Sequence, residues 1–418
     1  MKISKTGAKF SKFRGTEETL SQEILFQCSQ LKRHAAGIYG LGHFLIRARN
    51  KLSDVLRYNL HKFGSAEVSL PVLQPQSLWK ASGRFETFTS NNQMFVCEGR
   101  NGTSCLAPTG EEIVLDFINN NISSYKDLPI NIFQIGNKYR DEIRVRGGLM
   151  RSKEFLMKDA YSFHADFDDM VREYNSMKEC YRHIFSDLEL EIAVVKALSS
   201  DMGGKVSEEF MTFSKNGEDK ILVDKANNIA LNIEVLQNEE VLEEFKKTVS
   251  NFSISNFTEV NCTELGHIFQ LGTFYSEKMN GLFIDKDGQK KPYYMGCYGI
   301  GVNRVLGAIC ENFCDEHGLN WPQSISPYSV AVIYSKKYER QAIEVYETLS
   351  ANDVEVILFD TDDGFGSKIK NAKMLGLPKL AIIGKNFAES SKIELEDRKT
   401  GDKIFVDLPK LVEEFKSC

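Results

Sequence analysis

A cluster of basic side chains between Gly136 and Lys158 is the part of the sequence best suited to chemistry. This stretch holds seven basic residues against three acidic ones, within a chain whose net charge is −6. Its basic members are Lys138, Arg140, Arg144, Arg146, Arg151, Lys153 and Lys158. A planar guanidinium group donates hydrogen bonds in a fixed fork that matches phosphate oxygens. The cluster therefore favours a phosphate-binding site, and a basic surface turn is the alternative explanation.

Two strands are expected to position these side chains. Ile130–Tyr139 is apolar and rich in residues that favour strands, and Glu154–Phe163 alternates between two faces. A period of two is typical of a strand, so the two segments predict an antiparallel hairpin. Its long connection carries Arg144, Arg146 and the flexible pair Gly147–Gly148. Strands hold guanidinium groups in place better than a free loop does.

A second chemical feature lies in Ala107–Ile118, which reads APTGEEIVLDFI. Thr109 and Glu112 have the spacing of a capping box, and such a box opens a helix. Glu111 is not needed by this cap. A carboxylate beside a hydroxyl at the start of a helix could hold a small ammonium group. Both a plain cap and an ammonium site remain open from this stretch alone.

A third stretch with the composition of a binding site lies in the second half of the chain. Gly266–Tyr275 is β-rich and contains His267, Gln270 and Thr273, and Tyr294–Arg304 runs from a strand of small residues into a helix. Glycines at such a junction let the helix pack closely on a sheet, or let a ligand approach the backbone. The glycine pattern alone fits either explanation.

Length and composition limit the class of protein. The 418 residues predict two or three domains. The content of 42% hydrophobic and 26% charged residues is that of a soluble globular protein. No apolar run approaches the roughly 20 residues of a membrane span, so no membrane association is expected. Nine cysteines without paired CxxC spacing predict reduced thiols.

The remaining segments give a coarse order of elements. The basic arm Met1–Arg14 lacks the apolar core of a secretory signal, and an organellar targeting segment is the alternative interpretation of this arm. Further expected elements are a helix over Ser21–Leu60 interrupted by a turn at Gly37–Gly42, a strand over Glu67–Leu73, a helix over Phe167–Leu190, a mixed α/β stretch over Val194–Glu234 and an acidic helix within Val235–Phe257. After Pro327, strands alternate with helices and predict a small α/β domain.

Three motifs in a fixed order give the chain a family resemblance. Tyr139–Glu142, followed by Arg151, Phe155 and Asp159, resembles motif 2 of the class II aminoacyl-tRNA synthetases, and Gly299–Arg304 resembles their motif 3. The helix and strand that end at Pro71 resemble motif 1. Longer matches narrow the resemblance to the bacterial-type prolyl-tRNA synthetases of subclass IIa, in a short form without the editing insertion. These matches are Ala35–Gly40, Pro71–Pro75, Ala107–Glu112, Gly148–His164, Gly266–Asn280 and Met295–Arg304.

The resemblance implies a fold of two parts. Residues 1–325 would form an α+β catalytic domain, with the antiparallel sheet of class II synthetases flanked by helices. Residues 326–418 would form a C-terminal α/β anticodon-binding domain. Within the catalytic domain, 165–263 would be an intervening α/β segment whose last part, 235–263, occupies the insertion point of the editing domain. Motif 1 implies an isologous homodimer.

The resemblance also implies an activity. It is that of a proline–tRNA ligase, which forms prolyl-adenylate from ATP and L-proline and transfers the prolyl group to the 3′ end of tRNA(Pro). Mg²⁺ would accompany ATP, and no zinc is expected. Attack of a carboxylate on the α-phosphorus needs positioning and charge neutralisation more than acid–base help. The implied location is a bacterial cytoplasm, with the mitochondrial matrix as the alternative.

Each matched residue then has an implied role. Arg140 would bridge the α-phosphate of ATP and the carboxylate of proline, with Arg304 as the second catalytic residue. The implied ATP-binding residues are Arg140, Glu142, Arg151, Phe155, Gln270, Thr273 and Arg304. The implied proline-binding residues are Thr109, Glu111, Arg140, His164 and Gly299. Arg144 and Arg146 would contact the acceptor end of the tRNA.

The chain departs from its resemblance in one segment of consequence. Val235–Glu264 is too short for an editing fold, although bacterial relatives usually carry one at this point. A pocket that fits proline cannot strongly reject alanine, so mischarged tRNA would need a separate trans-editing protein. Two other functions stay open, namely a non-catalytic paralogue that binds tRNA and a sister class IIa synthetase, for threonine for example.

Overall fold

The two strands predicted around the basic cluster are present in the computed structural model as β7 (Ile130–Tyr139) and β8 (Glu154–His164). They are antiparallel, with Ile130 opposite Phe163 and Tyr139 opposite Glu154. The structure describes residues 1–12, 15, 17–100, 102–119, 121–198, 202–204, 206–224, 229–248 and 253–416. Its chain divides into two units, Ser53–Ala308 and the combination of Met1–Leu52 with Ile309–Cys418.

A nine-stranded sheet built on β7 and β8 organises the unit Ser53–Ala308. The strand order is β10-β9-β12-β11-β13-β16-β8-β7-β3, and β10 also pairs with β13. Its other strands are β3 (Ala66–Glu67), β9 (Ile192–Ala197), β10 (Val206–Phe213), β11 (Asp219–Asp224), β12 (Ile229–Asn232), β13 (Thr258–Gly272) and β16 (Tyr294–Gly301). All pairings are antiparallel except β3 with β7 and β12 with β9. The predicted antiparallel sheet is therefore confirmed.

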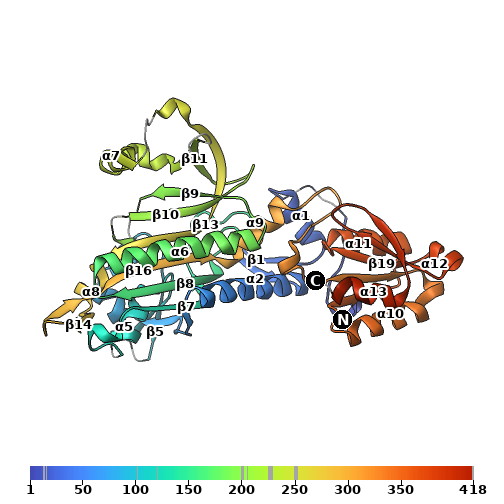
Figure 1. The fold of residues 1–418 in the computed structure, drawn as a ribbon, viewed down its shortest axis with the longest axis horizontal. Helices are drawn as coiled ribbons and strands as arrows, with labels where there is room; N and C mark the ends of the chain where they lie inside the picture. Colours follow the sequence, from blue (N-terminus) through green and yellow to red (C-terminus); the bar gives the residue numbers. More distant parts are fainter. Residues whose placement is uncertain are drawn as a thin grey trace. The chain divides into compact units, whose positions relative to one another are not determined.

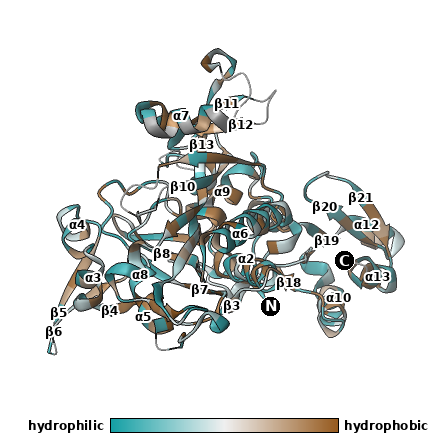
Figure 2. Ribbon diagram, turned by 60° about the vertical axis from the view of Figure 1, so that its left-hand side comes forward, coloured by the Kyte–Doolittle hydropathy of each residue, from teal (hydrophilic) through white to brown (hydrophobic). Residues whose placement is uncertain are grey.

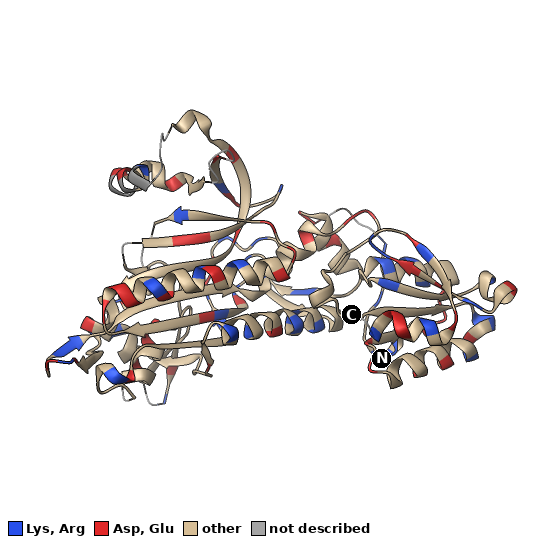
Figure 3. Ribbon diagram, viewed as in Figure 1, with Lys and Arg blue, Asp and Glu red and all other residues tan. Residues whose placement is uncertain are grey.

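Helix α6 (Phe167–Asp187) covers one face of this sheet, along β8, β16 and β13 (Figure 1). Its buried residues Met170, Tyr174, Met177, Tyr181 and Ile184 recur every three or four positions, which is the period of a helix with one apolar face. Acidic and basic side chains share its remaining surface (Figure 3). The helix predicted over Phe167–Leu190 is confirmed.

The opposite face packs against α5 (Glu111–Asn119) and α8 (Phe274–Lys278). Its core combines Val114 and Leu115 of α5 with Tyr161 of β8 and Tyr275 of α8, all at most 1% exposed. Burial of each such side chain stabilises the fold by roughly 1.5–3 kcal/mol. The residues predicted to form a capping box are used for other contacts. Thr109 donates to Glu111, and Glu112 accepts from Ser82 and Arg84.

Smaller elements complete this unit. They are β4 (Leu73–Pro75), α3 (Gln76–Ser82), α4 (Phe85–Ser90), β5 (Phe95–Gly99), β6 (Gly102–Leu106), η2 (Tyr125–Asp127), η4 (Ile233–Gln237), α7 (Glu239–Thr248), η5 (Ile254–Asn256), β14 (Leu282–Ile284) and β15 (Lys290–Pro292). The single strand expected over Glu67–Leu73 is wrong, because β3 pairs with β7 whereas β4 joins the separate β4-β6-β5 sheet. Val194–Glu234 is mainly strands β9 to β12, so its mixed composition concealed an extension of the sheet.

The unit of Met1–Leu52 and Ile309–Cys418 contains a five-stranded sheet of order β18-β17-β19-β20-β21. Its strands are β17 (Val330–Tyr334), β18 (Val356–Leu358), β19 (Lys379–Ile383), β20 (Ile393–Asp397) and β21 (Lys403–Val406). Its other elements include η6 (Gln323–Ile325), η7 (Lys336–Tyr338), α10 (Glu339–Ala351), α11 (Phe365–Met374), α12 (Lys385–Ser390) and α13 (Leu408–Lys416). The predicted alternation of strands and helices is confirmed, with α12 as an unexpected short helix.

The N-terminal part of this unit departs from expectation. Ser21–Leu60 is not one interrupted helix, because a hairpin of β1 (Leu31–Ala35) and β2 (Ile38–Leu41) separates α1 (Leu20–Gln27) from α2 (His43–Lys62). Gly37 forms the turn with a φ of +75°, a conformation open mainly to glycine. The short helix η1 (Ile3–Lys5) lies in the predicted basic arm, of which residues 13 and 14 are outside the described part.

The two boundaries between the units, after Leu52 and after Ala308, fall within helices α2 and α9 (Val302–Asn312). Teal and brown alternate along α2, as in an amphipathic helix (Figure 2). Among the described residues, no helix is both long and apolar enough to cross a membrane. All eight cysteines of the described ranges are free thiols, in line with the prediction, and Cys418 lies outside these ranges.

Candidate active site

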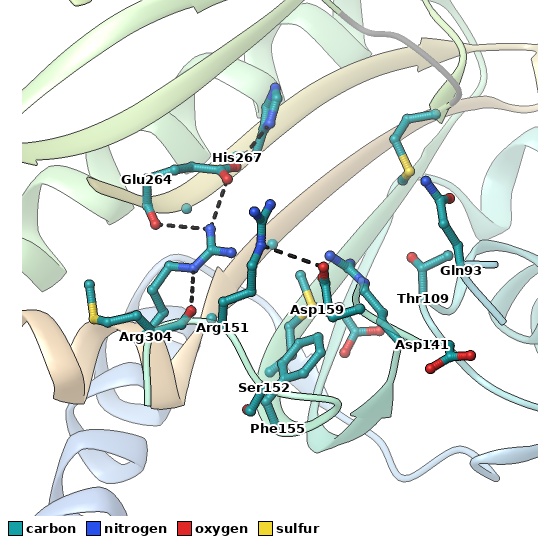
Figure 4. Close-up of a pocket in the computed structure, with 18 of the residues that line it drawn as sticks. Gln93, Thr109, Asp141, Arg151, Ser152, Phe155, Asp159, Glu264, His267 and Arg304 are labelled. Carbon is teal, nitrogen blue, oxygen red and sulfur yellow. Dashed lines mark hydrogen bonds and ion pairs between the residues drawn. The ribbon is translucent and has the colours of Figure 1, made fainter. Parts of the chain in front are cut away.

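A cavity of about 630 Å³ opens on the face of the large sheet opposite α6 (Figure 4). Its walls come from β8, β13, β16, the start of α9, the loop between β7 and β8 and the loop after α4. Eight of the residues expected at the site line this cavity, namely Thr109, Arg140, Glu142, Arg144, Arg151, Phe155, Gly299 and Arg304. The structure therefore brings together residues that lie almost 200 positions apart in the sequence.

The alternation of β8 sets the floor of the cavity. Phe155, Met157 and Asp159 lie two residues apart and line the cavity, whereas Lys158 points to the opposite face and donates to Tyr181 of α6. Gly299 of β16 is opposite Asp159. A Cβ atom at Gly299 would come within 2.7 Å of the Met157 methyl group, so a larger residue would fill the floor.

The arginine end of the cavity contains Arg140, Arg151 and Arg304. Arg304 Nη1 lies 2.9 Å from Glu264 Oε2, and its Nε donates to the Met150 carbonyl at 3.1 Å. Arg151 Nη1 lies 3.2 Å from Glu218 Oε2 and its Nε lies 3.5 Å from Glu142 Oε2. These two arginine side chains are 27% and 37% exposed, so a ligand anion can exchange with their carboxylate partners.

Arg140 is at the end of β7 and joins the arginine end to the rest of the cavity. Its Nε donates to the Pro108 carbonyl at 3.2 Å, and its guanidinium carbon lies 5.3 Å from the centre of the Phe155 ring. Burial and the nearby charge of Arg304 lower the pKa of Arg140. A ligand anion that contacts both arginines would relieve this repulsion.

A group of acidic residues surrounds the arginine end. Glu209 of β10, with Glu264 and His267 of β13, places potential metal-ligand atoms within 4.8 Å of one another. Burial raises the pKa of Glu209 to about 7, with the charge of Glu264 adding to the effect. Burial would also raise the pKa of Glu264, but His267 and Arg304 lower it to about 2. Two carboxylates and an imidazole could hold a divalent cation here.

The carboxylate end of the cavity lies behind Thr109 and Cys297. Glu111 is fully buried and is reached only through these lining residues. Thr109 Oγ1 donates to Glu111 Oε2 at 2.6 Å, and Cys297 Sγ donates to Glu111 Oε1 at 3.1 Å. Burial would raise the pKa of Glu111, but the charge of Arg84 and these two hydrogen bonds lower it, so the carboxylate stays ionised.

Besides Glu111, four of the expected site residues do not line the cavity. Gln270 follows the lining residue Phe269 along β13, and Thr273 donates to Glu277 at 2.7 Å. His164 is buried with its Nδ1 atom 2.7 Å from Asp169 Oδ2. Arg146 is exposed in the loop between β7 and β8, and its backbone pairs with that of Arg151 in an isolated antiparallel β-bridge. Their roles at the site stay predictions.

Several residues at the site were not predicted from the sequence. Arg84, between α3 and α4, contacts Glu111 and Glu112, and Glu264 pairs with Arg304. Met202 also lines the cavity. None of these residues belongs to a spacing pattern with a chemical meaning. The only signal for Arg84 in the sequence is that an arginine directly follows Gly83.

Comparisons with known proteins agree with this fold. The family model described as the tRNA synthetase class II core domain (G, H, P, S and T) matches residues 95–313, and the anticodon binding domain model matches residues 329–417. A proline–tRNA ligase from Rickettsia africae is 36% identical over 92% of each chain. A proline–tRNA ligase from Rickettsia bellii is 37% identical over 93% of this chain and 92% of its own.

Two solved structures share the fold at low sequence identity. A prolyl-tRNA synthetase from Cryptosporidium parvum, complexed with halofuginone and AMPPNP, aligns with a TM-score of 0.74 and 16% identity over 95% of this chain and 77% of its own. One from Giardia lamblia, in complex with prolyl-adenylate, aligns with a TM-score of 0.74 and 18% identity over 93% and 74%. The chain therefore belongs to the class II aminoacyl-tRNA synthetases and, within them, to the proline–tRNA ligase family.

Proposed function

We propose that the chain activates L-proline with ATP and transfers the resulting prolyl group to the 3′ end of tRNA(Pro). The observation that carries this proposal is one cavity with three arginines at one end and a buried, ionised carboxylate behind the other. Arginines complement the phosphates of ATP, and a carboxylate complements the ring ammonium of proline. The family to which the chain belongs supports the same reaction.

Positions in the cavity support roles for the lining residues. Arg140 lies between the two ends and would hold the α-phosphate of ATP against the carboxylate of proline. Arg151 and Arg304 would hold the γ-phosphate, and Glu142 would contact the adenosine. Phe155 would stack on the adenine, with Arg304 over its other face. Fixing both reactants in one geometry supplies most of the rate enhancement that such a reaction needs.

The proline side of the cavity would be formed by Thr109, Glu111 and Gly299. Thr109 and Gly299 line the cavity, and Glu111 accepts hydrogen bonds from Thr109 and Cys297. His164, Gln270 and Thr273 lie outside the lining, so their contact with proline or the adenylate would require a change in the cavity on binding.

Mg²⁺ would enter as part of the ATP substrate. Carboxylate oxygens suit this ion, and Glu264 and Glu209 offer them beside Arg304. His267 is a poor ligand for Mg²⁺ and would instead orient Glu264, with which it shares a contact of 3.2 Å. No zinc is expected in this role.

Several features of the wider assembly belong to the same proposal. The catalytic domain would span 1–325 and the anticodon-binding domain 326–418, and the enzyme would act as a homodimer in a bacterial cytoplasm, or alternatively in the mitochondrial matrix. Arg144 and Arg146, both exposed, would contact the acceptor end of the tRNA. A separate protein would hydrolyse alanyl-tRNA, since the described part of 235–263 holds only the end of η4, α7, η5 and the start of β13.

Amino-acid-dependent exchange of pyrophosphate into ATP tests the proposal directly. Proline should support exchange, alanine should support weaker exchange and threonine none, whereas Arg140→Ala should lose at least about 10³-fold. Exchange with threonine would identify a sister synthetase. No exchange from a folded protein, together with retained tRNA binding, would identify a non-catalytic paralogue.

The editing prediction needs a second assay. The purified chain should charge tRNA(Pro) with alanine and leave the product intact. Hydrolysis of alanyl-tRNA(Pro) by this chain alone would contradict the need for a trans-editing partner.

A further inference from the structure

A buried ion triad stands behind the carboxylate end of the cavity. Arg84 is 4% exposed, and Glu111 and Glu112 are both 0% exposed. The same atom, Arg84 Nη1, lies 3.2 Å from Glu111 Oε2 and 3.2 Å from Glu112 Oε1. One guanidinium group is therefore shared by two adjacent carboxylates.

Aromatic rings fix the position of this guanidinium group. Its carbon lies 4.5 Å from the centre of the Phe88 ring, 5.2 Å from that of Trp79 and 5.3 Å from that of Tyr275. Arg84 Nη2 also contacts Met202 Sδ at 3.5 Å. Rings on several sides hold a planar cation without competing for the carboxylates, so Nη1 stays aimed at both of them.

When both carboxylates are ionised, the triad has a net charge of −1. Burial raises the pKa of Glu112 to about 6, with Arg84 opposing this shift, so Glu112 is largely ionised at neutral pH. Ser82 Oγ donates to Glu112 at 2.7 Å and holds it away from the cavity. A buried charge without a full counter-charge is costly, and a cation bound in the cavity would relieve this cost.

The excess charge is directed to the cavity through Glu111. Its Oε2 atom is held by Arg84 and Thr109, whereas its Oε1 atom accepts a hydrogen bond from the thiol of Cys297. A thiol is a weak donor. An ammonium N–H entering past Cys297 would make a stronger, charge-assisted bond to the same oxygen.

We propose that Arg84 is a positioning residue that holds Glu111 for the substrate ammonium, and that Glu112 prevents Arg84 from neutralising Glu111. This inference rests on the proposed function, because it requires Glu111 to receive the ring nitrogen of proline. Arg84 itself does not line the cavity. The pair Arg84 and Glu112 thus tunes the affinity for the amino acid and leaves ATP binding unaffected.

Other titratable groups around Glu111 come from several elements. Tyr161 of β8, Tyr275 of α8 and Cys297 of β16 have pKa values well above their ordinary ones, first because they are buried and then because Glu111 or another acid is near. They stay neutral across the working range of pH. Arg140 is charged throughout, so Glu112, whose pKa is raised to about 6, is the group named here that changes charge between pH 5.5 and pH 8.

The test compares KM values in pyrophosphate exchange between pH 5.5 and pH 8. Arg84→Met should raise the KM for proline at least about 30-fold and the KM for ATP less than about 2-fold, since a direct charged hydrogen bond to Glu111 is lost. In this variant, kcat/KM for proline should fall at least about 10-fold from pH 8 to pH 5.5, because Glu111 without Arg84 takes up a proton. Arg84→Lys should restore part of both effects.

Glu112→Gln should instead make the KM for proline independent of pH. Arg84 then neutralises Glu111, so the KM for proline should rise about 5- to 20-fold at pH 8. This KM should not change further down to pH 5.5, because the group that titrates near pH 6 is gone and Glu111 is held ionised. The isosteric amide keeps the contact with Ser82, so this variant remains informative if Arg84→Met does not fold.

Arg398→Met is the matched control. Arg398 is a 6% exposed arginine with two contacts to Asp315, 2.6 and 2.9 Å long, in the other unit. Its loss should lower stability and leave both KM values within about 2-fold. Equal increases in the two KM values of Arg84→Met, or acid-sensitive profiles in both site variants, would overturn the inference. Absence of proline-dependent exchange in the parent enzyme would instead overturn the proposed function.

Discussion

The two ends of the cavity use the same kinds of charged groups in opposite surroundings. Arg151 and Arg304 are about one-third exposed and pair with carboxylates that an incoming anion can replace. Arg84, Glu111 and Glu112 are buried, so solvent does not replace their contacts with one another. Exposed pairs contribute up to about 1 kcal/mol, whereas removing one partner of a buried pair costs about 3–5 kcal/mol. The arginine end is thus suited to ligand exchange, and the carboxylate end to fixed geometry.

Removal of a buried partner should produce the largest loss of stability. Lys138 Nζ lies 2.8 Å from Asp159 Oδ1, and both side chains are 3% exposed. Lys138→Met should lower the free energy of unfolding by about 3–5 kcal/mol, because it leaves a buried carboxylate without its counter-charge. Arg151→Met is the matched exposed case and should cost less than about 1 kcal/mol. Urea denaturation of both variants measures the difference, and similar losses would remove the contrast between the two environments.

At the arginine end, a substitution should reduce activity strongly and stability only slightly, the reverse of what is expected for a buried pair. Arg304→Met should reduce kcat/KM for ATP about 10²- to 10³-fold, equivalent to about 3–4 kcal/mol, because it removes a cation from the phosphate-binding end. Its stability should change by less than about 1 kcal/mol. Steady-state exchange kinetics and denaturation curves together test this separation. An unfolded variant, or unchanged kinetics with ATP, would contradict it.

The acidic group near Arg304 should give a pH-dependent effect of intermediate size. The pKa of Glu209 is raised to about 7, above the ordinary value near 4.5, so the native state binds a proton more tightly than the unfolded chain. Its contribution to stability is therefore present below about pH 4.5 and is lost as the pH rises to 7. Glu209→Gln should be about 1–3 kcal/mol more stable relative to the parent at pH 8 than at pH 4.5.

Denaturation at several pH values checks this sign. A relative stability of Glu209→Gln that falls with rising pH would contradict the assigned shift. Glu264→Gln is the opposing control, because the pKa of Glu264 is lowered to about 2 by His267 and Arg304 against the effect of burial. Its native contacts are lost on mutation at every pH above about 4.5.

The smallest effect is expected at the exposed arginines of the β7–β8 loop. Arg144→Ala with Arg146→Ala should raise the KM for tRNA about 3- to 10-fold and change pyrophosphate exchange less than about 2-fold, since both side chains are exposed and would contact phosphates of the tRNA, although Arg144 also lines the cavity. The salt dependence of tRNA binding should decrease by about one to two phosphate contacts. A loss of exchange activity would place these residues in the activation step instead.

Local patterns were sufficient for the elements that obey a single period. The alternation in Glu154–Phe163 predicted β8 and the separation of its two faces, and the pattern in Phe167–Leu190 predicted α6. Ser21–Leu60 and Val194–Glu234 were interpreted wrongly, because short strands stabilised by distant partners carry little periodic signal of their own. The pairing of β10 with β13, for example, joins residues 49 to 64 positions apart.

The sequence by itself determined the arginine-rich hairpin, the order of the motifs and the alternation of strands and helices after Pro327. These features depend on the types and spacing of neighbouring residues, which a chain carries whether or not it is folded. Only the tertiary structure decided that Arg84 contacts both Glu111 and Glu112, and that Glu264 pairs with Arg304. Such contacts depend on packing between separate elements and on burial, which sets the energy of each charge.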